Sequence, residues 1–184
     1  MSSQILTAFV DGDDTLFKVK HLDGDEEVPE GWTEVAGTQH RLAAIARPSA
    51  RPFLIALGEK CDRVDMLTGN LSSTQNHVLK ALGLRQYIGR IEASNNSDRQ
   101  TPIDGPWVLV DNMYPGDEKI LPKFTEACGA EYEDTSDPRF VADQETYFVH
   151  CEPFEGEDDP QSLMDLLPKI EKKFQAQAHD FEDD

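Results

Sequence analysis

Residues 8–17 read AFVDGDDTLF, which combines the end of a predicted buried strand with a cluster of acids. The apolar run begins at Ile5 and ends at Val10, and Asp11 follows it directly. A buried strand that ends in carboxylates places them at the carboxyl edge of a sheet, where α/β proteins bind ligands. Asp11 and Asp13 can bring one carboxylate and one backbone carbonyl to the same hard cation, such as Mg²⁺. An acidic turn that merely follows a strand is the alternative interpretation.

The length and composition of the chain predict one globular domain. With 184 residues and 38% hydrophobic residues, it can bury a sizeable core, and no apolar run approaches the length of a membrane span. We expect the domain to cover residues 1–174 and a polar, acidic tail to cover residues 175–184. The N-terminus lacks the features of a signal peptide, and the three cysteines indicate neither a disulfide framework nor a zinc site. The expected location is therefore the cytoplasm.

The charge of the chain limits the class of its partners. Seventeen basic residues stand against 36 acidic ones, which gives a net charge of −19. Such a surface repels polyanions, so we expect no extended nucleic-acid surface. We also expect no membrane contact, since no apolar run is long enough for a span. The acidity fits a well-solvated surface, and a salt-rich cytoplasm is one setting for it. Nothing in the sequence determines the oligomeric state.

The apolar pattern alternates between strand and helix. Short apolar runs at residues 63–67, 91–93 and 107–110 are typical of buried strands, and helical spacing follows several of them. This alternation predicts an α/β fold, with a Rossmann-like parallel sheet and helices on both faces. Residues 18–46 are polar and turn-rich, which predicts a small β flap after the first strand, and no segment is long enough for a large cap domain.

Three of the predicted strands end in polar groups of different kinds. They lead into Asp11, into the sequence TGN at residues 68–70, and into Asp111 and Asn112. Parallel strands share a carboxyl edge, so these groups can converge although they are far apart in the sequence. Taken singly, residues 68–70 also fit a plain turn and Asp111 also fits a helix cap. Their combination favours a site.

This arrangement resembles the haloacid dehalogenase-like (HAD) phosphatases. Their first motif is an apolar strand followed by Asp-x-Asp-x-Thr, their second is a strand ending in Thr or Ser, and their fourth is a strand ending in acidic or amide ligands. The matching residues are Asp11, Asp13 and Thr15 in the first motif, Thr68 in the second, and Asp111 and Asn112 in the fourth.

Within this superfamily, the chain looks most like the group of RNA polymerase II C-terminal-domain phosphatases and NLI-interacting-factor-like proteins. RPSARPFL at residues 47–54 follows the start of a helix in that group, and VDN at residues 110–112 follows the end of one of its strands. Residues 158–168, with two aspartates and then LMDLLP, resemble its closing helix. The resemblance spans residues 5–174.

The resemblance implies a Mg²⁺-dependent phosphomonoester hydrolase. Asp11 is then the nucleophile that forms an aspartyl-phosphate, and Asp13 is the acid that protonates the leaving oxygen and the base that activates water. The implied Mg²⁺ ligands are Asp11, the backbone carbonyl of Asp13 and Asn112, with Asp111 binding directly or through an intervening group.

The same resemblance implies a phosphate-binding turn. Its donors are the hydroxyl of Thr68 and the N–H groups of Gly69 and Asn70, which open onto a helix N-terminus. The family also has a lysine shortly before the third of these strand ends, and residues 94–107 contain none. We assign the missing cation to Arg99, with Lys80 as the alternative.

The expected partner is a phosphorylated substrate, either a small molecule or a phosphoprotein. Two other functions stay open at this point. The missing lysine motivates a catalytically weak or inactive protein that binds a phosphorylated ligand or partner. The other is a nucleotide or nucleic-acid end phosphatase, which the charge disfavours for long nucleic acids but not for a mononucleotide.

Overall fold

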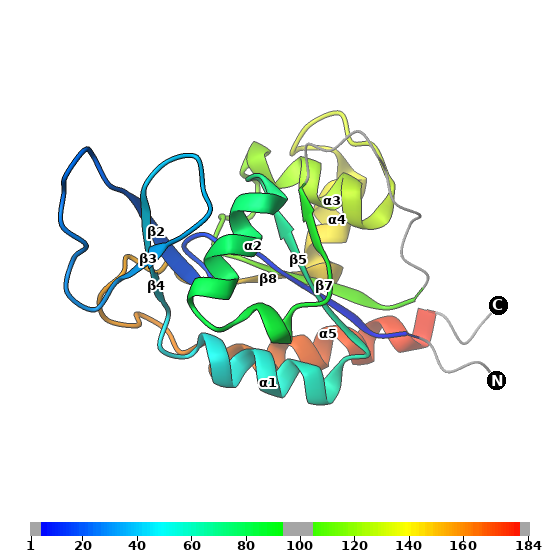
Figure 1. Ribbon diagram of the computed structural model, residues 1–184. Coiled ribbons are helices and arrows are strands. Elements are labelled where there is room, and N and C mark those ends of the chain that lie inside the picture. The colour runs from blue at the N-terminus through cyan, green and yellow to red at the C-terminus, as the bar shows by residue number, and fades with distance from the viewer. Residues whose placement is uncertain (1–4, 94–104, 181–184) are drawn as a thin grey trace.

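The computed structural model describes residues 5–93 and 105–180, which contain a larger and a smaller β-sheet (Figure 1). The larger sheet has five strands in the order β6-β5-β1-β7-β8, and all neighbouring strands run parallel. The predicted Rossmann-like parallel sheet is therefore confirmed. Its strands are β1 (Thr7–Val10), β5 (Arg63–Thr68), β6 (Ile91–Ala93), β7 (Trp107–Asp111) and β8 (Phe148–His150).

Both faces of this sheet are buried under helices. Ala8 and Val10 of β1 belong to one hydrophobic cluster and Phe9 belongs to another, because successive side chains of a strand point to opposite faces. Figure 1 shows α1 and α5 together on one side of the sheet, and α3 and α4 together on the other side. The helices of the first cluster are α1 (Ala50–Lys60), α2 (Ser72–Ala81) and α5 (Leu167–Asp180), and those of the second are α3 (Leu121–Cys128) and α4 (Pro138–Tyr147).

Short 3-10 helices lie in three of the connections, between α2 and β6, between β7 and α3, and between β8 and α5. They are η1 (Arg85–Tyr87), η2 (Glu118–Ile120) and η3 (Leu163–Leu166).

The smaller sheet is the predicted flap. Its three antiparallel strands, in the order β2-β4-β3, stand beside the main sheet (Figure 1). The apolar strand β4 lies in the middle, which explains why Leu42, Ala43 and Ala44 are buried in an otherwise polar segment. The strands are β2 (Phe17–His21), β3 (Thr33–Val35) and β4 (Leu42–Ala46).

The C-terminal helix is longer than the sequence predicts. The expected tail begins at residue 175, whereas α5 continues to Asp180. The reason is a tertiary contact of Gln177, whose side-chain amide accepts from the N–H of Trp107 and donates to its carbonyl, both at 2.9 Å. These two bonds fasten the last turns of α5 to β7. Residues 181–184 of the expected tail lie outside the described residues.

Candidate active site

The ends of three parallel strands meet at one edge of the main sheet. Val10 pairs with Met66 of β5 and with Val110 of β7. The next residue, Asp11, therefore lies level with the ends of both neighbouring strands, and its N–H donates to the carbonyl of Val110 at 2.9 Å. The structure thus brings Asp11 together with Asp111 although they are far apart in the sequence.

A tight loop follows Asp11 and carries the next acids. The carbonyl of Gly12 accepts hydrogen bonds from the N–H groups three, four and five residues later, at 3.3, 2.8 and 3.2 Å. Asp14 has a φ of 61°, a left-handed conformation that aspartate tolerates better than most residues. Its carbonyl accepts from the N–H of Phe154 at 2.7 Å. The loop is therefore fixed both by its own backbone and by the segment after β8.

Replacing Gly12 with alanine is expected to destabilise the protein. A Cβ on Gly12 would lie 2.5 Å from Gln75 Oε1 and 2.8 Å from Phe17 Cζ, and both of these side chains are buried. Overpacking of this kind costs about 1–3 kcal/mol. Urea-induced unfolding measures the loss, and Gly58→Ala is the control because a Cβ there has no neighbour within 4 Å. Equal stability of Gly12→Ala and wild type would contradict the expectation.

Lys123 of α3 lies between two carboxylates at the centre of the site. Its ammonium contacts Asp11 Oδ1 at 2.8 Å and also ion-pairs with Asp111 Oδ2. The three side chains are nearly inaccessible to solvent, with exposed fractions of 1% for Lys123, 6% for Asp11 and 0% for Asp111. A buried charge requires partners, and this ammonium serves both acids.

The pKa values in this cluster reflect the competition between burial and pairing. Burial raises the pKa of Asp11 and the Asp111 carboxylate adds to the rise, while Lys123 opposes both effects, and the resulting pKa is about 7. Burial alone would lower the pKa of Lys123, but the two carboxylates raise it well above its ordinary value. The ammonium therefore stays charged, and it offsets the repulsion between the two acids.

Asp13 is held by two amide side chains. Its Oδ2 accepts from Asn70 Nδ2 at 2.7 Å and from Gln75 Nε2 at 2.6 Å. Burial raises the pKa of Asp13, and these two hydrogen bonds only partly counteract the rise. A carboxyl group with a raised pKa is suited to give and to take a proton.

Thr15 brings two further oxygens together. Its hydroxyl donates to Asn112 Oδ1 at 3.2 Å and lies 3.5 Å from Asp11 Oδ2. Asp111 is engaged elsewhere, because its Oδ1 accepts from the N–H of Met113 at 2.8 Å and its Oδ2 pairs with Lys123. Asp11 and Asn112 therefore offer oxygen atoms that face the same hydroxyl.

These oxygens are of the type that suits a hard cation. Across residues 5–93 and 105–180, no group of three or more His, Cys, Asp or Glu side chains has the arrangement of a metal site. Mg²⁺ requires less than that, since it commonly binds one or two carboxylates and keeps several waters. A carboxylate and an amide oxygen beside a backbone loop fit this requirement.

The predicted phosphate-binding turn lies at the same edge. Thr68 ends β5 and is buried, and its Oγ1 accepts from the N–H of Asn70 at 3.1 Å. Gly69 lies between them, and a Cβ there would have no neighbour within 4 Å, so the surface at this point is open. Residues 68–70 lead directly into α2, as the sequence predicts.

The cation beside Asp11 is not one that the sequence predicted. Lys80 is exposed in the last turn of α2, and no contact between it and Asp11 is found in the described part of the chain, so its assignment was wrong. Arg99 lies outside the described residues. Lys123 contacts Asp11 instead, from a helix that follows the Asp111 strand rather than preceding it.

Sequence reasoning missed Lys123 and also Gln75, yet a signal for Lys123 existed. Ile120, Phe124 and Ala127 are the buried stripe of η2 and α3, and Lys123 occurs at the same helical spacing. A lysine on a buried stripe needs a counter-charge, because lysine is almost never fully buried unless it is paired. Gln75 gives no comparable signal, since it sits in a polar stretch of α2.

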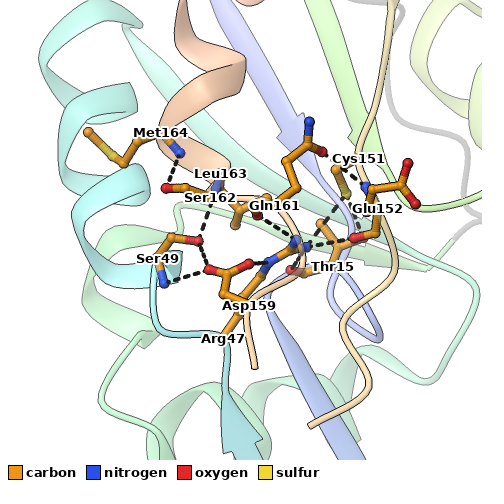
Figure 2. Close-up of polar contacts among 10 residues, drawn as sticks. All are labelled: Thr15, Arg47, Ser49, Cys151, Glu152, Asp159, Gln161, Ser162, Leu163 and Met164. Atoms are coloured by element: carbon orange, nitrogen blue, oxygen red, sulfur yellow. Dashed lines mark hydrogen bonds and ion pairs between the residues drawn. The ribbon is translucent and has the colours of Figure 1, made fainter. Parts of the chain in front are cut away.

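A second buried charge, the guanidinium of Arg47, stabilises the loop that follows Asp11. The guanidinium of Arg47 is inaccessible to solvent and pairs with Asp159 at 2.7 Å (Figure 2). It also donates to the carbonyls of Thr15, Glu152 and Gln161 at 3.3, 2.9 and 2.6 Å. Arg47 therefore joins the loop after Asp11 to the segment between β8 and α5.

Asp159 completes this network on the other side. Ser49 donates to its Oδ2 through both the hydroxyl and the N–H, and the same hydroxyl accepts from the N–H of Leu163 (Figure 2). Burial alone would raise the pKa of Asp159, but the hydrogen bonds from Ser49 and Arg47 hold it below its usual value. The carboxylate is therefore charged and fully paired.

Comparison with known proteins returns solved structures only. No model of a known protein family matches the chain, and no curated protein matches it. A structure of fission yeast RNA polymerase II CTD phosphatase Fcp1-R271A bound to beryllium fluoride matches with a TM-score of 0.42 and 12% identity, over 94% of this chain and 51% of that one. A structure of Fcp1, an essential RNA polymerase II CTD phosphatase, matches with a TM-score of 0.44 and 13% identity, over 95% and 49%.

The chain resembles Fcp1 in its fold. The chain spans about half the length of these structures. The contacts of Asp11, Asp13 and Lys123, rather than this distant likeness, support the function proposed below.

Within the two described segments, the longest stretches of apolar helix fall short of what a membrane crossing requires.

Proposed function

We propose that this chain is a Mg²⁺-dependent phosphomonoester hydrolase that acts through an aspartyl-phosphate on Asp11. The contact of Lys123 with Asp11 carries this proposal, since it supplies the cation that the sequence motifs lacked. A buried carboxylate beside a buried ammonium, with a second carboxyl group two residues away, is the set of groups that phosphoryl transfer through an acyl phosphate needs.

The reaction has two steps. In the first, an oxygen of the Asp11 carboxylate attacks phosphorus, the bond to the leaving oxygen breaks, and the carboxyl group of Asp13 gives its proton to that oxygen. In the second, the Asp13 carboxylate takes a proton from water, the water oxygen attacks phosphorus, and inorganic phosphate leaves as Asp11 regains its charge. The raised pKa of Asp13 supports its role as the acid of the first step.

The phosphoryl oxygens need positive groups around them. Lys123 offers one charge, and the N–H groups of Gly69 and Asn70, with the Thr68 hydroxyl, lie ahead of the N-terminus of α2. The same edge carries several carboxylates, which repel an incoming phosphate unless a cation reverses the local field. For this reason we include Lys123 in the proposed phosphate-binding set.

The residues that would hold Mg²⁺ are Asp11, Asn112 and the carbonyl of Asp13. When bound there, Mg²⁺ supplies charge neutralisation for the phosphoryl group. We propose that Asp111 does not bind Mg²⁺ directly, because both of its carboxylate oxygens already have partners. It positions Lys123 and the backbone of Met113 instead.

Removal of the metal tests the proposal. Wild-type protein with Mg²⁺ is expected to hydrolyse p-nitrophenyl phosphate and members of a panel of sugar phosphates, nucleotides and phosphopeptides. Chelation with EDTA is expected to lower the rate by at least about a hundredfold, and added Mg²⁺ should restore it, since the metal contributes several kcal/mol of charge stabilisation. Phosphate release is the measurement.

Two outcomes would count against the proposal. An undiminished rate in EDTA would rule out the metal dependence. No turnover of any compound, together with Mg²⁺-dependent binding of inorganic phosphate, would instead favour the binding protein that remained an alternative at the level of sequence.

A further inference from the structure

A cleft of about 720 Å³ opens between the flap and the start of α2. Its walls come from three places: the loop after Asp11, strands and turns of the flap, and the first turns of α2. The flap reaches across to α2 at Gly37, where a Cβ would lie only 2.6 Å from His77 Cε1. The flap therefore contacts α2 directly at one side of the cleft.

Asp13 lines the cleft. Asp13 and its two partners, Asn70 and Gln75, are among its lining residues. If Asp13 protonates the leaving oxygen, then the leaving group must extend from Asp13 into this space. This step rests on the proposed function. The volume falls within the range of small-molecule sites and far exceeds what a phosphoryl group alone fills.

The charges along the cleft exclude one class of leaving group. Asp13 and Asp14 line it, and Lys18 is the one Lys or Arg side chain among the described lining residues. Lys18 is already committed, because its ammonium pairs with Asp14 at 2.8 Å and with Glu155 at 2.9 Å. A second phosphate in this space would face the Asp14 carboxylate, whose partner Lys18 is already shared with Glu155, and like-charge contacts of this kind are unfavourable.

The remaining polar groups suit a neutral leaving group. The flap contributes His21, Thr38, Gln39 and His40, and α2 contributes hydroxyl and imidazole groups of its own. Hydroxyls and side-chain amides both donate and accept hydrogen bonds. These are the groups that pair with the hydroxyls of a sugar.

We infer that this cleft selects phosphomonoesters whose leaving group is neutral, rich in hydroxyls and of sugar or nucleoside size. The three observations behind it are the presence of Asp13 among the lining residues, the absence of an unpaired Lys or Arg among the described lining residues, and the hydroxyl and amide groups along the walls.

Matched pairs of substrates test this inference. Glucose 6-phosphate is compared with glucose 1,6-bisphosphate, and adenosine 5′-monophosphate with adenosine 3′,5′-bisphosphate, while p-nitrophenyl phosphate reports the chemistry itself. Each monophosphate is expected to have a kcat/KM at least about tenfold higher than its bisphosphate, with most of the difference in KM. A phosphoserine peptide serves as a further competitor.

A charge placed in the cleft provides the matched variant. Gln39 is exposed and lines the cleft, so Gln39→Lys adds a cation that is free to meet a second phosphate. It is expected to raise the ratio of kcat/KM for each bisphosphate to that for its monophosphate by up to about fivefold, which is the range of one exposed ion pair. Gln86→Lys adds the same charge at an exposed position outside the cleft, and we expect no change in selectivity from it.

The results separate this inference from the function on which it rests. Hydrolysis of p-nitrophenyl phosphate with equal rates for mono- and bisphosphates would overturn the inference and leave the phosphatase standing. A phosphopeptide preferred more than tenfold over every sugar and nucleoside phosphate, or an equal effect of Gln39→Lys and Gln86→Lys, would also overturn it. Failure to hydrolyse any phosphate would overturn both.

Discussion

Asp11→Asn is expected to abolish phosphatase activity, with kcat lowered by about 10⁴-fold or more. An amide oxygen is a far weaker nucleophile than a carboxylate, so no acyl phosphate forms. The substitution keeps the size and shape of the side chain, and it leaves Lys123 paired with Asp111. The loss should therefore be in kcat, while Mg²⁺-dependent binding of phosphate weakens less.

The same substitution should not destabilise the fold. Burial and the Asp111 carboxylate raise the pKa of Asp11 to about 7, which means that folding disfavours the charged form of this residue. Asparagine removes that penalty, so we expect the midpoint of thermal unfolding to stay equal or to rise, a common trade-off at active sites.

Rates with p-nitrophenyl phosphate and thermal unfolding of the same samples measure both effects. Asp165→Asn makes the same chemical change at an exposed position in η3 and should behave as wild type in both assays. A rate within tenfold of wild type for Asp11→Asn would show that Asp11 is not the nucleophile.

Arg47→Met is expected to cause the largest loss of stability, about 3–5 kcal/mol, because it removes a guanidinium that is inaccessible to solvent and leaves the half-buried Asp159 carboxylate without its cation. Asp159 keeps only its bonds from Ser49, and the carbonyls of Thr15, Glu152 and Gln161 lose their donor. Domains of this size lose about 2–4 °C of midpoint per kcal/mol, so the unfolding midpoint should fall by roughly 10 °C.

The pH dependence of this loss has a definite sign. The folded-state pKa of Asp159 lies below its usual value, so the pair stabilises the protein above the unfolded-state pKa and loses that contribution as the pH falls through the folded-state pKa. The difference between wild type and Arg47→Met should therefore narrow below about pH 4.

An exposed arginine provides the control for Arg47. Arg41 pairs with Glu34 at 3.0 Å, but the two side chains are 41% and 50% exposed. Arg41→Met should therefore cost no more than about 1 kcal/mol. Equal losses for the two variants in urea-induced unfolding would show that the buried pair contributes no more to stability than the exposed one.

Much of the fold could be predicted because the relevant signals are local. The buried run before Asp11, the similar runs before Thr68 and Asp111, and the helical spacing between them each span only a few residues. A parallel sheet covered on both sides requires nothing more than this alternation. The shared edge of such a sheet then brings the strand ends together, and this is why three of the site segments were predictable.

The opposing cation was not predictable in the same way. Lys123 meets Asp11 across 112 residues, and Arg47 meets Asp159 across the same separation. Such contacts depend on how a helix is rotated and where it crosses the sheet edge, and both are set by the packing of Ile120 and Phe124 against the second hydrophobic cluster. Spacing within the sequence has no information on that rotation.

The sequence by itself determined the parallel sheet, the flap and the acids that end its strands, because strand periodicity and strand ends are properties of neighbouring residues. Only the tertiary structure decided that Lys123 rather than Lys80 faces Asp11, that Gln75 holds Asp13, and that the flap closes a cleft beside it. These features arise where side chains from distant segments must fill and neutralise one shared, buried space.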